Sequence, residues 1–416
     1  MNLMLKTVEE FSRRHRYDIN PSKSSCIRVN PKSPVQSTNF ALEGTRIPFD
    51  TSTTHLGIHR NTKCKVNTKD KVELGRRTAY SLMGACFNGK NGLKQSVKSR
   101  LWSTFVVPRM LYGLEVLPYS QADLKALEVF QIKTLKQVQH LADRTSNVAA
   151  LSLLGILPIR AQIHKNTLNL YYSIIQNSET VEYKVAERQL AMKLPTDHSF
   201  FSNIRKLLHT YNLPTAYQLL DSPPGKEVWK AKLNSAVDQH TIATWREEFK
   251  EKPSLKYINT DALSIGKPHH LYTYERPHKI DNLRAETKAK LLTGTYTLQA
   301  NRAVFNQYTV NSTCTLCKTE PECRVHFIAK CPISDAVRDK FKARLLECLR
   351  LHGREDPLEL VNNADSFTQL ILDSTHPSVN NGHLPSKKEI ESIELLSREY
   401  IWCIHLLRCR EVAKGS

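Results

Sequence analysis

Apolar residues recur at helical spacing in the opening of the chain. Leu5, Val8 and Phe11 follow one another at intervals of three within Leu3–His15, and charged side chains fill most positions between them. This spacing predicts an amphipathic helix. Short apolar segments separated by turn residues follow it, and they predict strands over Ser25–Val29 and Thr53–Ile58. A hairpin is predicted between these strands, with arms Asn39–Leu42 and Arg46–Phe49 around a turn at Glu43-Gly44.

After residue 60 the pattern becomes mainly helical. Ser120 is a candidate N-cap with Asp123 three residues later. The helix that follows should place one apolar stripe inward: Leu124, Leu127, Leu135, Val138 and Ala142. Pro158 is expected to open another helix, with an inward stripe of Ile159, Ile163, Leu170 and Ile174. We interpret these stripes as core positions.

The middle of the chain, residues 177–280, is more polar and less regular. Ser222-Pro223-Pro224-Gly225 predicts a flexible joint between helices. His269 and His270 are adjacent, but no cysteine or carboxylate lies near them in the sequence. We therefore interpret them as loop residues and not as metal ligands.

Charge is distributed unevenly. The chain of 416 residues carries a formal net charge of +20, and residues 1–115 hold 20 Lys and Arg against 8 Asp and Glu, so they contribute +12 of it. A basic surface of this density favours a polyanionic partner such as nucleic acid. The alternative is a basic protein without such a partner. The opening residues lack the apolar core of a secretory signal, and no apolar run reaches the length of a membrane span, so we expect a nuclear or cytoplasmic location.

One motif carries specific chemistry. Cys314, Cys317, His326 and Cys331 form the pattern C-x2-C-x8-H-x4-C. Three thiolates and one imidazole suit tetrahedral Zn²⁺, and four protein ligands leave no open coordination position for catalysis. Cys323, within the same segment, is the rival ligand. Nearby basic residues are compatible either with phosphate contacts or with a solvated helix face: Lys318, Arg324, Lys330, Arg338, Lys340, Lys342 and Arg344.

The chain resembles the C-terminal half of a LINE-type (non-LTR) retrotransposon reverse transcriptase. The resemblance rests on the Cys/His pattern and on short sequence motifs that occur in the family's order. They are Leu3–Asn20 with Pro21-Ser22-Lys23-Ser24, His55-Leu56-Gly57-Ile58, Leu101–Tyr112 with Gly113-Leu114-Glu115, Leu153-Leu154-Gly155-Ile156-Leu157-Pro158, Lys290-Leu291-Leu292-Thr293-Gly294 and Glu399–Cys409. His55 stands where the family's primer-gripping strand has an aromatic residue.

The resemblance implies a mainly α fold with a small α+β remnant at the N-terminus. Its implied divisions are a late-palm remnant (1–60), a basic helical thumb (61–155), a helical connector (156–305), a CCHC zinc knuckle (306–345) and a C-terminal helical segment (346–416). It also implies RNA or primer–template duplex as partner, within a retrotransposon ribonucleoprotein. The implied contact residues are Lys23, His55, Gly57, Arg60, Arg76, Arg77, Lys94, Lys98 and Arg100. With its strand partners absent, the remnant is expected to be the least stable part.

One departure from the family matters for activity. Polymerisation needs paired aspartates and a third carboxylate to hold two Mg²⁺ ions. No Asp-Asp pair occurs in the sequence, which begins just after the point where the family has that turn. We therefore expect no catalytic residue and no Mg²⁺ in this chain, and a product that binds nucleic acid without extending it. Two alternatives stay open: a fragment of an active RNA-directed DNA polymerase, and a zinc-stapled helical scaffold without nucleic-acid binding.

Overall fold

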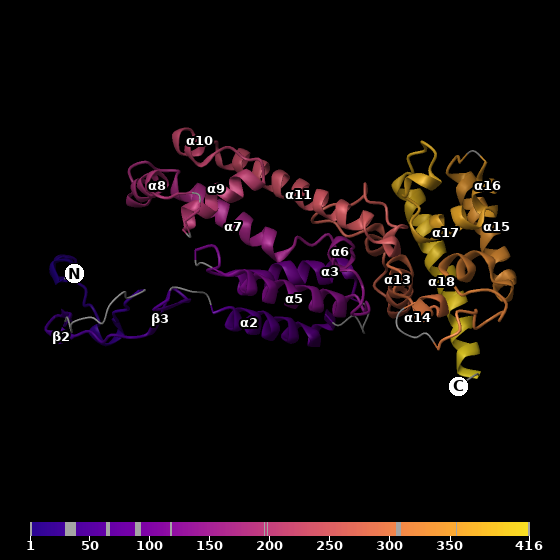
Figure 1. Cartoon of the computed structure of the whole chain (residues 1–416), viewed down its shortest axis with the longest axis horizontal. Helices are drawn as coiled ribbons and strands as arrows, with labels where there is room; N and C mark the ends of the chain where they lie inside the picture. Colours follow the sequence, from indigo (N-terminus) through magenta and orange to yellow (C-terminus); the bar gives the residue numbers. More distant parts are fainter. Residues whose placement is uncertain are drawn as a thin grey trace.

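The computed structural model describes residues 2–414 except 30–38, 64–66, 88–92, 117–118, 195, 198, 305–308 and 355. The described chain is mainly helical, with two small antiparallel sheets of two strands each. Figure 1 shows the N-terminal residues at one end of an elongated molecule and the C-terminal helices at the other. The predicted mainly α class is confirmed at this level.

The described part of the N-terminal segment contains the α-helix α1, a short 3-10 turn at Pro21–Lys23 and both hairpins. Its elements are α1 (Asn2–Arg14), β1 (Ala41–Leu42), β2 (Thr45–Arg46), β3 (Ser52–His55) and β4 (Ile58–Asn61). β1 pairs with β2, and β3 pairs with β4. Leu42 and Ile47 are the buried apolar side chains among the described residues of 2–61, whereas Leu3, Met4 and Phe11 of α1 are more than half exposed. The segment therefore buries little apolar surface.

Two strand predictions in this segment are wrong. Thr53–Ile58 is not one strand, because Leu56 and Gly57 both have positive φ, 50° and 74°, and reverse the chain between β3 and β4. Two successive left-handed residues form the tight turn that matches the twist of a hairpin. Ser25–Val29 does not form a strand either, since only Cys26 bridges to Phe49.

Seven helical segments form the first part of the main bundle. They are α2 (Thr68–Leu82), a π-helical turn (Met83–Phe87), α3 (Gln95–Leu101), a second π-helical turn (Trp102–Val106), α4 (Val107–Leu111), α5 (Gln121–Val138) and α6 (Asn147–Ser152). The capping box predicted for α5 is present: the amide of Asp123 donates to the Ser120 hydroxyl, and the Asp123 carboxylate accepts from the Ser120 amide at 2.8 Å. The predicted stripe of α5 is buried, apart from the half-buried Ala142 beyond the helix end.

A second core lies among the next helices. These are α7 (Ile159–Ile174), α8 (Val181–Met192), α9 (Phe200–Thr210), α10 (Ala216–Asp221) and α11 (Lys226–Lys250). In α7 the buried positions include Leu168 and Tyr171, whereas the predicted Leu170 and Ile174 are only half-buried. The Tyr172 hydroxyl donates to the Pro224 carbonyl at 2.6 Å, which holds the expected joint at 222–225 against α7.

The C-terminal helices pack into the same hydrophobic core as α2 to α6, called the main core below. They are α12 (His270–Thr273), α13 (Lys279–Leu292), α14 (Gln299–Val304), α15 (Asp335–Leu351), α16 (Pro357–Asn362), α17 (Ala364–Leu372) and α18 (Lys387–Lys414). Short turns of 3-10 or π helix lie at Pro21–Lys23, Pro253–Leu255, His326–Lys330, Pro332–Ser334 and Pro377–Val379. One hydrophobic cluster contains Trp102, Tyr272, Phe327 and Tyr400, so it runs across the expected limits at 155, 305 and 345.

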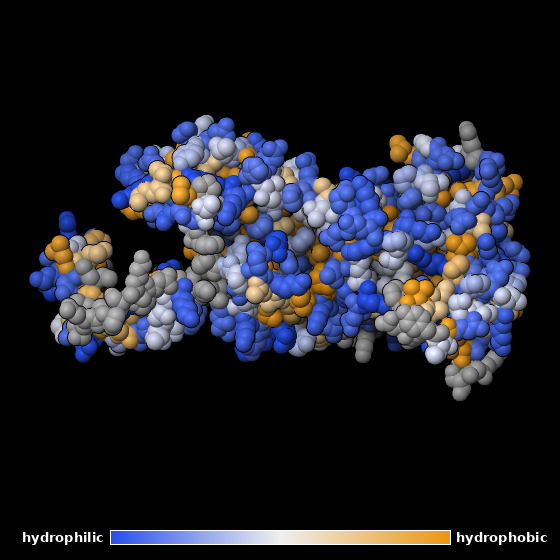
Figure 2. Space-filling view, viewed as in Figure 1, coloured by the Kyte–Doolittle hydropathy of each residue, from blue (hydrophilic) through white to orange (hydrophobic). Residues whose placement is uncertain are grey.

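Hydrophilic side chains cover most of the face drawn in Figure 2. None of the described helices combines the length and the apolar composition that a bilayer crossing requires.

Candidate metal centre and basic face

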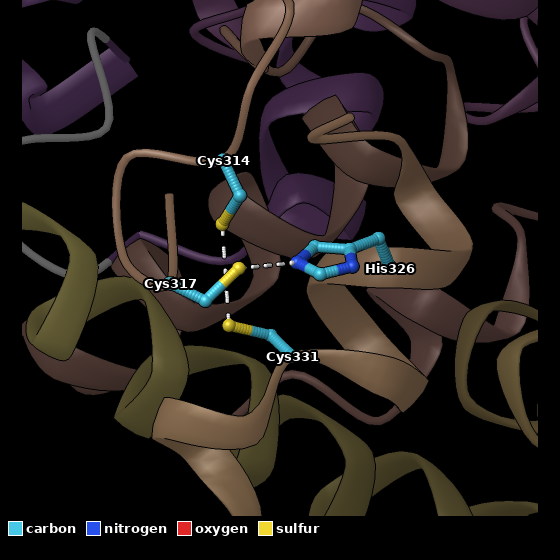
Figure 3. Close-up of side chains that lie close together, drawn as sticks. All are labelled: Cys314, Cys317, His326 and Cys331. Atoms are coloured by element: carbon cyan, nitrogen blue, oxygen red, sulfur yellow. Dashed lines mark hydrogen bonds between the residues drawn. The ribbon is translucent and has the colours of Figure 1, made fainter. Parts of the chain in front are cut away.

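The four residues of the Cys/His pattern converge on one point (Figure 3). One ligand atom from each of Cys314, Cys317, His326 and Cys331 lies within 4.8 Å of all the others. The Sγ atoms of Cys314 and Cys331 are 3.9 Å apart, and the Cys317 Sγ is 3.3 Å from Nε2 of His326. This group can hold a metal ion with all four donors supplied by the protein.

Local structure explains how eighteen residues build this centre. A turn carries the first two cysteines, with Lys318 at φ 58° and its amide donating to the Cys314 carbonyl at 2.9 Å. His326 begins a π-helical turn, and Cys331 follows that turn directly. A short antiparallel bridge between Thr313 and Pro321 closes the loop.

Two neighbours orient the ligands. Oε2 of Glu320 lies 3.0 Å from Nδ1 of His326, which leaves Nε2 to face the sulfur atoms. Carboxylates of this kind fix the tautomer and raise the basicity of a ligating histidine. The Thr319 hydroxyl donates to the Cys317 Sγ at 3.1 Å. Neither role follows from the C-x2-C-x8-H-x4-C spacing, although both residues lie inside it.

Cys323 does not join the group. It is exposed, and its sulfur accepts the His326 amide at 3.4 Å, so it supports the start of the turn that carries the histidine. The geometry thus favours the predicted set over the rival ligand.

The thiols differ in how easily they ionise. Burial opposes ionisation of Cys317, but donors from Thr319 and the Glu320 amide outweigh it and lower its pKa to about 6. Burial raises the pKa of Cys314 to about 12 and also raises the pKa of Cys331. A metal cation would supply the charge that stabilises all three thiolates together.

The centre is fixed to the rest of the fold. Phe327 and Ile328, directly after His326, are fully buried in the main core. Glu322 is also fully buried, and its Oε1 lies 2.7 Å from Nε of Arg408 in α18. The loop over residues 314–331 is therefore anchored both to the main core and to α18.

Most arginines near the centre have internal partners. Arg324 donates to the Ser254 carbonyl at 2.8 Å and lies over the Tyr257 ring, Arg338 pairs with Asp335, and Arg344 makes two 3.0 Å bonds to Glu399. Arg344 is nevertheless exposed, as are Lys318, Lys330 and Lys340, whereas Lys342 is half-buried. These contacts support a structural role for the arginines.

The predicted nucleic-acid contacts divide between surface and interior. Most are exposed: Lys23, His55, Gly57, Arg60, Arg76, Arg77 and Arg100, with Lys94 half-buried before α3. Arg77 pairs with Glu73 one turn earlier on α2. Exposed aromatic rings occur in the same region, at Tyr80, Phe105 and Tyr112.

Lys98 is not a surface contact, and its prediction is wrong. Its side chain is completely buried, and Nζ donates to the Val138 carbonyl at 3.2 Å at the end of α5. Burial lowers the pKa of Lys98, opposed by the nearby carboxylates of Glu275 and Glu286. Gln95, Lys98 and Trp102 lie on the buried side of this helical run, so the positive charge faces inward.

The expectation that His269 and His270 have no carboxylate partner is also wrong. Asp373, 104 residues beyond His269, places Oδ2 3.3 Å from Nε2 of His269 and Oδ1 3.5 Å from Nε2 of His270. By distance these three residues can hold a metal ion.

Hydrogen bonding favours another role for this group. Nδ1 of His269 accepts the Leu271 amide at 3.2 Å, which in a neutral ring leaves the proton on Nε2, facing Asp373. Asp373 also accepts the Asn259 amide at 2.8 Å and the Thr375 hydroxyl at 2.7 Å. We therefore interpret the group as a buried junction that joins α12 to the segment after α17.

Comparison with known proteins adds no family assignment, since no family model, no curated protein and no solved structure matches the chain.

Proposed function

We propose that this chain binds RNA or primer–template nucleic acid through its N-terminal basic region, and that its Cys3His centre holds a structural Zn²⁺ ion. The binding proposal is carried by one observation. Exposed Arg76 and Arg100 have no acidic partner among the described residues. Exposed Tyr80 lies on α2 with Arg76, and exposed Phe105 lies in the π-helical turn that follows α3 and Arg100. Cations neutralise phosphates and aromatic rings stack on bases, so the combination fits a polynucleotide.

The zinc proposal rests on donor chemistry. Three sulfurs and one imidazole nitrogen are soft to borderline ligands, which favour Zn²⁺ over Mg²⁺ or Ca²⁺. Four protein ligands leave no position for water or substrate, and Phe327 beside the centre belongs to the core. We infer that the ion stabilises this part of the fold and does not take part in a reaction.

The family proposal remains the C-terminal half of a LINE-type (non-LTR) reverse transcriptase. What supports it, besides the ordered motifs, is that two of them meet: the Tyr112 hydroxyl donates to the Leu56 carbonyl, and Gly113 lies close to the Ile58 side chain. The 416 residues contain no Asp-Asp pair, so we expect no primer extension by this chain alone. The alternative is that the chain is a fragment of an active RNA-directed DNA polymerase.

Affinity for a labelled RNA at several salt concentrations tests the binding proposal. We expect log affinity to fall linearly and steeply with log salt, as counterion release requires. The absence of binding at low salt would contradict nucleic-acid binding and would favour the alternative of a zinc-stapled helical scaffold. Mg²⁺-dependent incorporation on a primed template would show instead that the chain is catalytic.

A further inference from the structure

The surface between α4 and the first half of α7 contains a hollow that the Cys/His centre and the exposed cations do not explain. Its volume is about 390 Å³, within the range of small-molecule sites. Its apolar walls include Pro108, Leu111 and Tyr112, and its polar groups include Glu115, Gln162 and Asn166.

Two amides form one edge of this hollow. Nε2 of Gln162 donates to Oδ1 of Asn166 at 3.0 Å, one helical turn away on α7. This bond leaves the Gln162 carbonyl oxygen and the Asn166 amide nitrogen without a partner among the described residues. The pair therefore offers one acceptor and one donor side by side. Every nucleobase presents a neighbouring donor and acceptor on its Watson–Crick edge, and that edge is free only when the base is unpaired.

The rest of the hollow fits a base better than a phosphate. Pro108 and Leu111 provide apolar surface for a flat ring, and Tyr112, about half exposed, provides an aromatic one. The Glu115 carboxylate repels a phosphate from the interior but accepts from base amino groups. Exposed Arg100 and Arg109 belong to the same helical run, where the backbone of a bound strand can be neutralised.

We propose that this hollow binds one unpaired base of a single-stranded nucleic acid. The inference rests on the proposed nucleic-acid binding and adds a preference for single strands that carry bases. The salt-dependent contacts come from the exposed cations, whereas the hollow contributes a contact that salt does not screen.

A binding experiment on the full chain separates the two contributions. The probes are a single-stranded 12-nucleotide RNA, its blunt duplex and an abasic ribose-phosphate strand of equal length. We expect the wild-type chain to prefer the base-containing single strand. Gln162→Leu and Asn166→Leu should each weaken binding to that strand about 5- to 30-fold, the loss expected for one hydrogen-bonded contact with a base. Neither variant should change affinity for the abasic strand or the slope of log affinity against log salt.

Gln239→Leu is the matched control, since Gln239 is an exposed helical amide on α11 that bonds Ser235 one turn away. It should bind like wild type, and the helical circular dichroism of all variants should be unchanged. Equal wild-type affinity for the base-containing and abasic strands would overturn the base hollow while leaving phosphate binding intact. A loss in Gln162→Leu that is equal for both strands would also overturn it. No binding to any probe would contradict the proposed function itself.

Discussion

The Tyr112 hydroxyl donates a 2.7 Å hydrogen bond to the carbonyl of Leu56, 56 residues earlier in the chain. This bond joins the tip of the β3–β4 hairpin to the end of α4. Gly113 lies beside it at φ 83°, where an added Cβ would come within 3.1 Å of Ile58. The N-terminal segment buries few apolar side chains. It is held to the helical bundle partly by the Tyr112 hydrogen bond and by the close approach of the Gly113 backbone to Ile58.

Tyr112→Phe should loosen the hairpin without unfolding the bundle. The variant removes one neutral hydrogen bond at a half-exposed site, so we expect a local cost of about 1 kcal/mol. Amide hydrogen exchange of Ile58–Asn61 should accelerate, and limited proteolysis should cut sooner within residues 2–61. The melting temperature of the bundle should stay within about 1 °C. Tyr80→Phe, on the exposed side of α2, is the control and should change neither rate.

Removal of one ligand should remove the metal. We expect the wild-type chain to bind one Zn²⁺ ion per molecule and Cys317→Ser and His326→Ala each to bind none, measured as moles of metal per mole of protein. Glu320→Ala should keep the ion with affinity lowered about 10- to 100-fold, because it only orients His326. Cys323→Ser should bind like wild type. A loss of zinc in Cys323→Ser with retention in Cys317→Ser would contradict the ligand set.

Substitutions of Arg100 and Lys98, two basic residues of the same helix, should affect different properties: nucleic-acid binding for Arg100 and stability for Lys98. Arg100→Gln should leave thermal stability unchanged and reduce the salt slope of RNA binding by about 0.7, the value for one phosphate contact on a single strand. Lys98→Met should lower the free energy of unfolding by about 1–3 kcal/mol, because it removes a buried hydrogen-bonded charge. It should leave the salt slope unchanged. A reduced slope in Lys98→Met with normal stability would contradict its burial.

Stability should fall as pH rises through neutrality because of Glu275. Its side chain is 1% exposed, and burial raises its pKa from 4.5 to about 7, against an opposing hydrogen bond from the Gln95 amide. The folded state therefore binds a proton that the unfolded state has released. The resulting stabilisation is complete below pH 4.5 and disappears as pH rises through about 7.

Glu275→Gln checks this assignment, since the amide keeps the shape but does not titrate. We expect the free energy of unfolding of the wild-type chain to decrease between pH 5 and pH 8 relative to the variant. Each unit of pKa shift corresponds to about 1.4 kcal/mol. Parallel pH profiles for the two proteins would show that Glu275 keeps its ordinary pKa.

Local sequence signals predicted the features that depend on neighbouring residues. The capping box at Ser120 and Asp123 needs only two residues of one helical turn, and it is present. The converging Cys3His group follows from donor spacing within eighteen residues, and its four ligand atoms meet. The tight turn at Leu56-Gly57 does not follow from the pattern that predicts a strand over Thr53–Ile58, although Gly57 is a turn signal within it.

The sequence by itself determined the helical class, the unequal distribution of charge and the Cys/His group that can hold a metal ion, because each depends on residue type and short-range spacing. Tertiary structure alone decided which charges face water. Lys98 points into the protein and Arg100, two residues later, points out, because α3 packs against α5 with the side of the helix that carries Lys98. His269 acquired Asp373 as partner across 104 residues. Contacts of that range depend on how the helices pack, which no local pattern encodes.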